Sequence, residues 1–253
     1  MEDEPIEIKV SEGGYKMNNW LYNEFKHCGV DYSDLKQAEI YDQQHQKFRD
    51  YEKEFIEMLD YLSLDNLQEM NLVDLGCGTG ATAICAAKHF KKIFAVDVSD
   101  VMINQAKRKA EQENISNIEF INSGFLSYEH KAEPVDLVLT KAAFHHLPDF
   151  WKQIALLRIN KMLKMGGRLY IHDVVFHFQP SDYLTEINEW VSTFEVIAGK
   201  EFKSEVETHI RDEFSTFSWI MEGMLLKAGF EIEKIRTTDG FVTEYACKKI
   251  REE

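Results

Sequence analysis

Three glycines alternate with other residues directly after a short apolar run that contains an acid. The segment reads Asp74-Leu75-Gly76-Cys77-Gly78-Thr79-Gly80, and an alanine-rich stretch follows at 81–87. Glycine permits positive φ and leaves room for a ligand near the backbone, and a helix start offers unpaired N–H groups. The G-x-G-x-G spacing differs from the G-x-G-x-x-G of dinucleotide-binding turns. The segment therefore predicts a strand, a glycine turn and a helix N-terminus that together hold a polar ligand.

A second acid, Asp97, ends the next apolar run, which begins at Lys92. A carboxylate offers two acceptor oxygens to two adjacent O–H donors, such as those of a ribose. An acid at a strand end also suits capping of the next helix, although Ser99 is itself a good cap. We prefer ribose binding as the interpretation of Asp97, and capping is the alternative.

Two adjacent histidines, His145 and His146, follow a fourth apolar strand at 135–140. Histidine accepts a proton near neutral pH, so either ring is a candidate general base if the acceptor must lose a proton. Asp173, near the end of a fifth strand, is a candidate contact for a cationic or hydroxylic acceptor. The other histidines and the four cysteines show no metal-ligand spacing, so no metal is predicted.

Alternating strand and helix patterns position these residues. Apolar steps of three or four predict a helix over 39–62 and a shorter one over 20–26. Further helices are expected at 150–164 and 214–228. The chain ends in two strands, 230–236 and 241–249, and the Asp-Gly pair between them is a strong hairpin signal. The pattern as a whole predicts an α/β sheet protein.

The alternation breaks between Phe176 and Asp212, where aromatic and acidic residues follow helical spacing and Gly199 interrupts them. An insertion after the fifth strand lies beside the substrate end of such a sheet. We therefore expect it to form a lid or a specificity element. The alternative is a surface pair of helices that thickens the domain or makes a dimer contact.

The order of these motifs resembles the class I S-adenosylmethionine (SAM)-dependent methyltransferases. Asp74 to Gly80 resembles their motif I, Asp97 resembles the motif II acid, and the strand before the His-His-Leu turn resembles motif IV. The resemblance covers roughly 40–249. It implies a Rossmann-like, seven-stranded, mostly parallel sheet with an antiparallel last strand and helices on both faces. Extra N-terminal helices and a helical insertion after strand 5 would be added to it.

The implied division is an N-terminal helical arm or lid at 1–68 and a SAM-binding domain at 69–253, with the insertion at about 176–212. By the resemblance, Asp74 helps to order the cofactor ammonium and Asp97 binds both ribose hydroxyls. Gly124 stands where such enzymes often carry an Asp for the adenine amino group. Adenine binding would then fall to backbone groups and to Phe125.

The resemblance extends to two sets of contacts. The predicted cofactor contacts are Asp74, Gly76, Cys77, Gly78, Gly80, Asp97, Val98, Met102, Gly124, Phe125 and Tyr41, and for Tyr41 simple packing on the domain is the alternative. The predicted acceptor contacts are Phe144, Asp173, Trp190 and Trp219.

Composition limits the partners. The formal net charge is −15, and such an acidic surface repels nucleic-acid backbones. The sequence has no run of 18 apolar residues and no apolar segment after its acidic N-terminus, so a cytoplasmic protein without a membrane span is expected. The predicted function is SAM-dependent methyl transfer to a small molecule. The alternatives are a non-catalytic SAM-binding or interaction module of the same fold and, less favoured, an NAD(P) oxidoreductase. A homodimer is one possible assembly.

Overall fold

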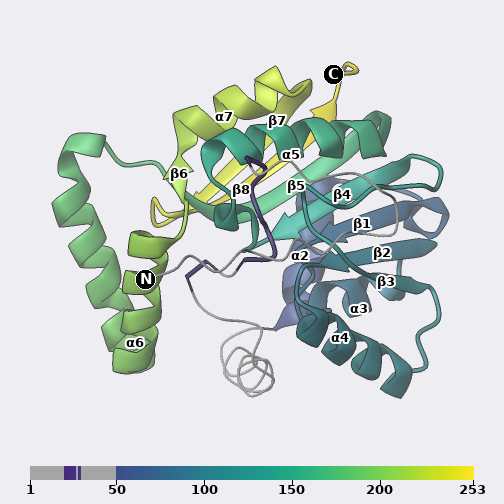
Figure 1. Ribbon diagram of the computed structural model, residues 1–253, viewed down its shortest axis with the longest axis horizontal. Coiled ribbons are helices and arrows are strands. Elements are labelled where there is room, and N and C mark those ends of the chain that lie inside the picture. Colours follow the sequence, from purple (N-terminus) through teal and green to yellow (C-terminus); the bar gives the residue numbers. More distant parts are fainter. Residues whose placement is uncertain (1–19, 27, 30–49) are drawn as a thin grey trace, which may run out of the picture.

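The computed structural model describes residues 20–26, 28–29 and 50–253, except for the side chains of 197–198 and 201–202. Figure 1 shows a central sheet with helices packed around it and one helical element standing beside it. The helices are α2 (Tyr51–Leu62), α3 (Ala81–Ala87), α4 (Asp100–Gln112), α5 (Asp149–Met162), α6 (Tyr183–Asp212) and α7 (Ser218–Lys227). Three short 3-10 turns are η1 (Leu67–Glu69), η2 (Phe144–His146) and η3 (Pro180–Asp182).

The strands form one sheet in the order β3-β2-β1-β4-β5-β8-β7, with the short β6 paired to β5. Their bounds are β1 (Asn71–Leu75), β2 (Lys92–Asp97), β3 (Ile118–Asn122), β4 (Val135–Lys141), β5 (Leu163–Phe176), β6 (Thr216–Phe217), β7 (Phe230–Thr238) and β8 (Val242–Lys249). β8 runs antiparallel to both of its neighbours, whereas the pairings from β3 to β5 are parallel. The predicted sheet is confirmed, and β6 is an addition to it.

Helices cover both faces of the sheet, so the central strands are apolar on both sides. On β1, Leu72 faces a core that includes residues of α2, α3 and α4. Its neighbour Val73 faces the opposite core, which is built largely with α5 and α7. Side chains alternate between the two faces of a strand, and this alternation sends successive residues into different cores. Strands buried on both faces read as continuous apolar runs, as parallel strands commonly do.

The strand order reverses between β1 and β4, which are hydrogen-bonded neighbours. Loops that leave β1 and β4 at their carboxyl ends turn to opposite faces of the sheet at such a switch point. The crevice between those loops is where open α/β sheets bind ligands. The candidate residues of the glycine turn and of the His-His turn leave the sheet at this place.

Among the described residues before Ser63, only those of α2 are helical. α2 begins at Tyr51, where Asp50 caps it by accepting a hydrogen bond from the N–H of Lys53, and 39–49 lie outside the described residues. The helix predicted over 20–26 is wrong, because these residues form turns and bends. Trp20 is 68% exposed, so the apolar spacing has no continuous core to pack on. Asn23 instead uses its side chain to accept from the N–H of Phe25.

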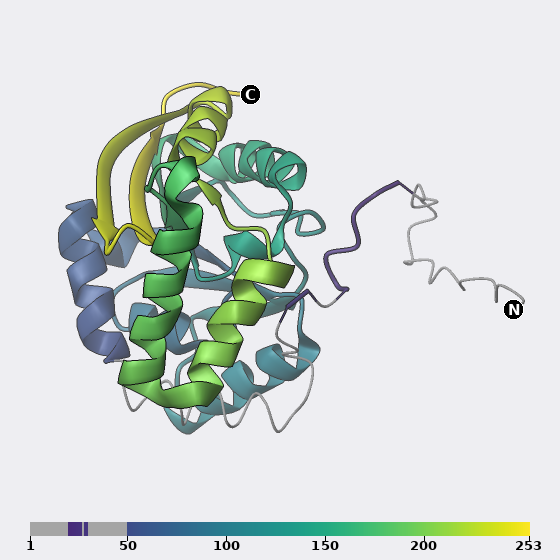
Figure 2. The same cartoon turned by 90° about the vertical axis from the view of Figure 1, so that its left-hand side faces the viewer.

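The insertion after β5 is helical, as predicted. α6 is broken at Gly199, whose φ of 87° and ψ of −179° are not helical. Figure 2 shows the two halves of α6 lying side by side and the chain returning to the body of the protein. The division at residue 68 remains a prediction. α2 lies before this boundary and α3 lies after it, and both contribute residues to one core. No described helix is both long enough and apolar enough to cross a membrane.

Candidate functional site

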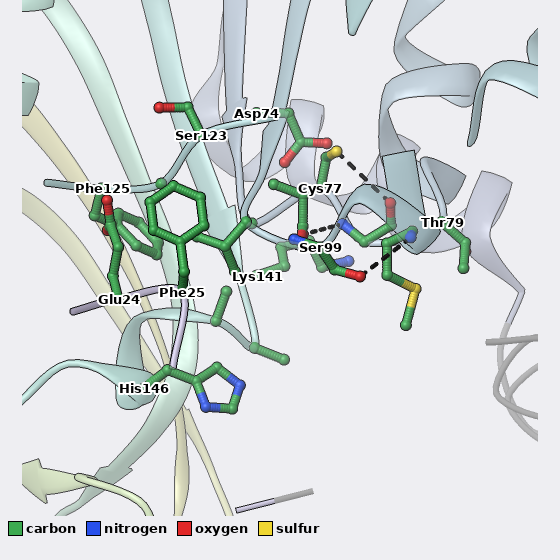
Figure 3. A pocket seen from close by; sticks show the side chains of 18 of the residues that line it. Glu24, Phe25, Asp74, Cys77, Thr79, Ser99, Ser123, Phe125, Lys141 and His146 are labelled. Carbon is green, nitrogen blue, oxygen red and sulfur yellow. Dashed lines mark hydrogen bonds between the residues drawn. The ribbon is translucent and has the colours of Figure 1, made fainter. Parts of the chain in front are cut away.

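A cavity of about 360 Å³ opens at the carboxyl ends of β1, β2 and β4 (Figure 3). Its wall consists of the glycine turn, the starts of α3 and α4, the loops after β3 and β4, and the N-terminal residues 24–26 and 28. The lining residues from the predicted cofactor set are Asp74, Gly76, Cys77, Gly78, Asp97, Val98, Met102, Gly124 and Phe125. The structure therefore brings together segments that are up to about a hundred residues apart in the chain.

The three glycines of the turn have three different surroundings. All have positive φ, but a Cβ on Gly78 would meet nothing within 4 Å. A Cβ on Gly76 would lie 2.3 Å from that of Ala143, and one on Gly80 would lie 2.7 Å from that of Ala106. Gly78 thus leaves room for a ligand, while Gly76 lets the loop after β4 approach and Gly80 lets α4 pack. Gly80 packs against α4 and is not part of the cavity lining, and its contact with a cofactor stays a prediction.

Asp97 braces the glycine turn and faces the cavity. Its carboxylate accepts from the N–H of Gly78 at 2.8 Å and from the N–H of Ser99 at 2.9 Å. Capping of α4 is done by Ser99, whose hydroxyl accepts from the N–H of Met102. Burial raises the pKa of Asp97, and the two N–H bonds oppose this rise. A carboxylate has about four lone-pair sites, so two remain for a ligand with two hydroxyl groups.

Asp74 is 2% exposed, and its Oδ2 has no hydrogen-bond partner among the described residues. Burial raises its pKa to about 7, with nearby Asp97 adding to the rise and Lys141 opposing it. An unpaired buried carboxylate is costly unless something compensates it. Asp74 also lines the cavity. A cationic group bound there would supply the missing partner.

Gly124 and Phe125 line the corner of the cavity beside β3, where a neighbour from outside the predicted set fills the space. The carboxylate of Glu24 accepts from the N–H groups of Leu126 and Ser127, at 2.9 and 2.7 Å. A Cβ on Gly124 would lie 2.4 Å from a Glu24 carboxylate oxygen. The absence of a side chain at Gly124 therefore makes room for an acid from the N-terminal segment. Figure 3 shows Glu24 and Phe25 at this corner with Phe125.

The two histidines of η2 have different environments. His146 lines the cavity, and burial lowers its pKa to about 4, so its ring is neutral at pH 7. His145 does not line the cavity. Its Nδ1 contacts Asp173 at 2.5 Å and its Nε2 lies 3.3 Å from Glu213, and these carboxylates raise its pKa although burial opposes them. Of the two predicted bases, only His146 is placed to reach a ligand in the cavity.

The structure does not place the four predicted acceptor contacts in the cavity wall. Phe144 is buried in the core against Phe125. Asp173 accepts from the backbone N–H of Phe144 and pairs with His145, which holds its pKa well below the usual range despite its burial. Trp190 stacks on Phe241 with ring centroids 4.5 Å apart, and Trp219 is 65% exposed on α7. Each of these side chains has another partner or position in the structure, and its contact with the acceptor stays a prediction.

Several cavity residues were absent from the predicted set. Tyr51 on α2 and Lys141 at the end of β4 line the wall, and the Lys141 ammonium pairs with Glu54 at 3.0 Å. Lys141 directly follows the strand predicted at 135–140, so its place in the sequence indicates the end of the sheet at which the cavity lies. Glu24 and Tyr51 carry no local motif, and only the path of the chain brings them here. The predicted contact of Tyr41 lies outside the described residues.

The lining suits the cofactor that the resemblance implies. SAM has a sulfonium and an ammonium, a ribose with two hydroxyls, and a flat adenine. The cavity offers the orphaned oxygen of Asp74 to a cation, the remaining acceptor sites of Asp97 to hydroxyls, and apolar walls at Val98, Met102 and Phe125. A buried carboxylate with an unpaired oxygen is what a cationic ligand requires, and the nearby Lys141 ammonium pairs with Glu54.

Comparison with known proteins agrees with this geometry. Residues 72–167 match a family model described as a methyltransferase domain. An uncharacterized methyltransferase of Geobacillus sp. is 24% identical over 204 residues, which are 74% of this chain and 93% of that protein. An (S)-coclaurine N-methyltransferase of Papaver somniferum is 24% identical over 202 residues, 75% of this chain and 55% of that protein. The fold is similar to that of a S-adenosylmethionine-dependent methyltransferase from Clostridium acetobutylicum, with a TM-score of 0.61, 16% identity and coverage of 84% and 97% of the two chains.

Proposed function

We infer that this chain, whose residues 72–167 carry a methyltransferase domain, is a class I SAM-dependent methyltransferase, and we propose that it methylates a small molecule. The cofactor brings an electrophilic methyl group on its sulfonium. The protein's part is to bind the cofactor, orient the acceptor in line with the S–CH3 bond and exclude water. Nothing in the described residues favours the oxidoreductase or the non-catalytic alternative.

The observation that carries the proposal is the pair of acids around an open glycine turn at the switch point of the sheet. Asp74 offers an unpaired oxygen, and Asp97 is held by the turn itself. We assign Asp97 to the ribose hydroxyls and Asp74 to the cationic end of the cofactor. Gly78 allows the cofactor to approach the backbone, because the space beside its Cα is open.

The corner at Gly124 and Phe125 is the proposed adenine site. Phe125 offers an aromatic surface, and the backbone near Ser123 offers polar groups. The Glu24 carboxylate, fixed by two N–H groups, stands next to this corner. We assign Glu24 to the rim of the adenine site, where its remaining lone pairs accept from the exocyclic amino group.

His146 is the proposed acceptor-side residue. It lines the cavity together with Leu147 and Ala143, on the side formed by the loop after β4. A neutral imidazole accepts a proton. With a pKa of about 4 His146 is a weak base, but it can take the proton of a hydroxyl acceptor, because that proton becomes strongly acidic as the methyl group is transferred to the oxygen. An acceptor that has already lost its proton would not need this step, and orientation would then carry the catalysis.

A small molecule fits the acceptor side better than a macromolecule. The N-terminal residues 24–26 and 28 line part of the cavity, and the net charge of −15 disfavours a nucleic-acid acceptor. Whether the acceptor atom is oxygen, nitrogen, carbon or sulfur is the question for an activity screen. Incubation with methyl-labelled SAM and a fractionated metabolite extract should transfer label to a small product.

Isothermal titration with SAM and with S-adenosylhomocysteine tests the cofactor assignment. We expect both to bind with one site per chain, and NADH, as the control, to give no heat. Absence of heat from SAM and from its demethylated product would overturn the proposal. Binding of both without label transfer to any fraction would point to the non-catalytic alternative.

A further inference from the structure

Three potential metal ligands from distant parts of the chain meet behind the His146 wall of the cavity. The side-chain ligand atoms of His145, His146 and Glu213 all lie within 4.8 Å of one another. His145 and His146 belong to η2, whereas Glu213 directly follows α6. The Nε2 of His145 is 3.3 Å from a Glu213 oxygen. A tetrahedral ion with ligand bonds of about 2.0 Å holds its ligand atoms about 3.3 Å apart.

We propose that His145, His146 and Glu213 bind a divalent transition-metal ion. Two imidazoles and one carboxylate bind the ion in known zinc and non-haem iron sites, and these sites keep a further coordination position open. The sequence pattern predicted no metal, because 66 residues separate His146 from Glu213 and no motif joins them. The insertion that carries Glu213 therefore contributes to the site only through the tertiary structure.

The orientation of His145 is the one that a metal-binding imidazole requires. Its Nδ1 is held at 2.5 Å by Asp173, which is itself buried and fixed by the N–H groups of Phe144 and Val174. A carboxylate on Nδ1 places the ring proton there and leaves the lone pair on Nε2, which faces Glu213. Metal-binding histidines commonly have such a carboxylate on their second nitrogen.

The carboxylate of Glu213 is oriented in a similar way. It contacts Nδ1 of His209, one turn earlier in α6, and Nε2 of that histidine lies 2.7 Å from the hydroxyl of Ser215. The Glu213 side chain is 3% exposed, and a Cβ on Gly29 would overlap it. Only a residue without a side chain can cover the carboxylate at that point.

The backbone around Glu213 is fastened to the His-His turn. The N–H of Phe214 donates to the carbonyl of His145 at 2.8 Å. The carbonyl of Phe214 accepts from the buried Lys152, and Thr216 donates to Asp149 at 3.0 Å. These bonds hold the end of α6 against the start of α5 and fix the distance between the ligand atoms. The ligand set is therefore preorganised rather than assembled by a loose segment.

A proton network is the competing explanation for the cluster. A protonated His145 between Asp173 and Glu213 would neutralise part of the buried negative charge. In that case the cluster would bind Zn²⁺ no better than scattered surface histidines. A metal ion would satisfy the same Glu213 carboxylate and would also bind the ring of His146, whose ligand atom lies within 4.8 Å of the other two.

The location gives the ion a role in the proposed methyl transfer. His146 belongs to the metal cluster and also lines the cavity. The open coordination position of the ion would therefore lie next to the acceptor. An oxygen or thiolate acceptor could then complete the coordination of the ion. A bound ion lowers the pKa of a coordinated hydroxyl, and it would take over the part that a free His146 ring plays as the base. This role rests on the proposed function, whereas the binding of the ion does not.

Metal titration of the full chain tests the proposal. Chelator-treated protein would be titrated with Zn²⁺ against a chromophoric chelator and with Co²⁺ by visible absorption. We expect one ion per chain, with Co²⁺ bands typical of a low coordination number. Glu213→Gln and His146→Gln should each weaken Zn²⁺ binding at least about tenfold. His177→Gln, a change at an exposed histidine outside the cluster, should leave binding unchanged.

The results separate the two proposals of site and function. Circular dichroism and thermal unfolding establish that each variant is folded, and either ligand variant alone is sufficient for the comparison. Failure of the wild-type chain to bind an ion, or equal binding by a folded Glu213→Gln or His146→Gln, would overturn the metal site. SAM titration of the metal-free wild type reads the cofactor site independently, so loss of one proposal leaves the other standing.

Discussion

Asp74 and Asp97 both face the cavity, but different partners satisfy them. Asp97 accepts two backbone N–H groups, while one oxygen of Asp74 has none among the described residues. This difference separates two functions within one ligand. Asp97 is held rigidly enough to select the geometry of a diol. The buried, partly unpaired carboxylate of Asp74 lowers the stability of the protein until a cation binds beside it.

Replacing Asp97 with alanine should weaken SAM binding at least about tenfold, because a hydrogen bond to a charged group contributes about 1.5–3 kcal/mol. Isothermal titration measures the change. Asp136→Ala is the matched control, since Asp136 also accepts a backbone N–H, that of Asn71, but is not part of the cavity lining. That control should cost about 1–3 kcal/mol of stability and little affinity. Wild-type affinity in Asp97→Ala would remove the ribose assignment.

The pKa of Asp74, raised by burial to about 7, predicts a pH-dependent affinity. Below pH 7 the carboxyl is protonated and cannot attract a cation, so SAM binding should strengthen as pH rises from 6 to 8. Asp74→Asn, which has no charge to gain, should flatten this slope. The raised pKa also makes Asp74 destabilising in the ligand-free protein. Between the ordinary pKa of an aspartate and pH 7, the folded state binds the proton more tightly than the unfolded state does. The free energy of unfolding therefore falls as pH rises through this range. SAM would be titrated into the wild type and into Asp74→Asn between pH 6 and pH 8. Identical pH slopes of SAM affinity in the two proteins would contradict the assignment of Asp74 to the cation.

At the scale of elements, the β1–α3 turn combines packing with binding. Gly76→Ala should lower the free energy of unfolding by about 2–4 kcal/mol, because its Cβ would overlap Ala143 at a positive φ. Thermal unfolding should show a fall of roughly 5–15 °C.

Gly78→Ala is the contrasting variant in the same turn. A Cβ there meets no protein atom within 4 Å, so the loss of stability should be limited to about 1 kcal/mol of backbone strain. The methyl group would project into the space assigned to the cofactor, and SAM affinity should fall more than stability does. Unfolding curves and SAM titration on both variants test the distinction. If Gly76→Ala and Gly78→Ala changed stability and SAM affinity to the same extent, Gly78 would not face the ligand.

The N-terminal segment acts as a rim that Glu24 attaches to the loop after β3. Removal of its carboxylate in Glu24→Ala leaves the N–H groups of Leu126 and Ser127 without their acceptor. Hydrogen exchange at these two amides should accelerate, and SAM affinity should fall about tenfold. Glu57→Ala, a change at an exposed glutamate on α2, is the control. Unchanged exchange at 126 and 127 would show that the attachment is absent in solution.

For the whole molecule, the net charge of −15 acts on a cationic cofactor. Long-range attraction should raise the association rate of SAM, and salt should reduce it as the Debye length falls to ~3 Å at about 1 M. S-adenosylhomocysteine lacks the sulfonium charge and is the matched control, so its rate should change less. Stopped-flow fluorescence at several salt concentrations measures both. Equal salt dependence of the two ligands would exclude this steering.

The whole chain also explains why the insertion is part of the functional region. α6 leaves the end of β5 and returns through Glu213 to the His-His turn, where backbone and side-chain bonds fasten it. Sequence patterning predicted the insertion and its break at Gly199. Trp190, one of the aromatic residues expected to contact the acceptor, stacks on Phe241 and so packs α6 against the body of the protein. Homodimerisation remains a prediction for light scattering to test.

The sequence by itself determined the features that depend on neighbouring residues. Alternating apolar runs specified the strands, the Asp-Gly pair specified the closing hairpin, and the spacing from Asp74 to Asp97 specified the two acids at adjacent strand ends. Local patterns suffice for these features because backbone preference and side-chain periodicity act over a few residues. The cofactor wall of the cavity was for this reason largely predictable.

Only the tertiary structure decided which distant residues meet. Glu24 reaches the space left by Gly124, and Glu213 reaches the two histidines, although no pattern in the sequence links either pair. The tertiary structure also decides that Asp173 pairs with His145 and that Trp219 is largely exposed, and the acceptor contacts of both residues stay predictions. Contacts of this kind depend on the path of the whole chain and on the packing of its helices, which the types and spacing of residues do not encode locally.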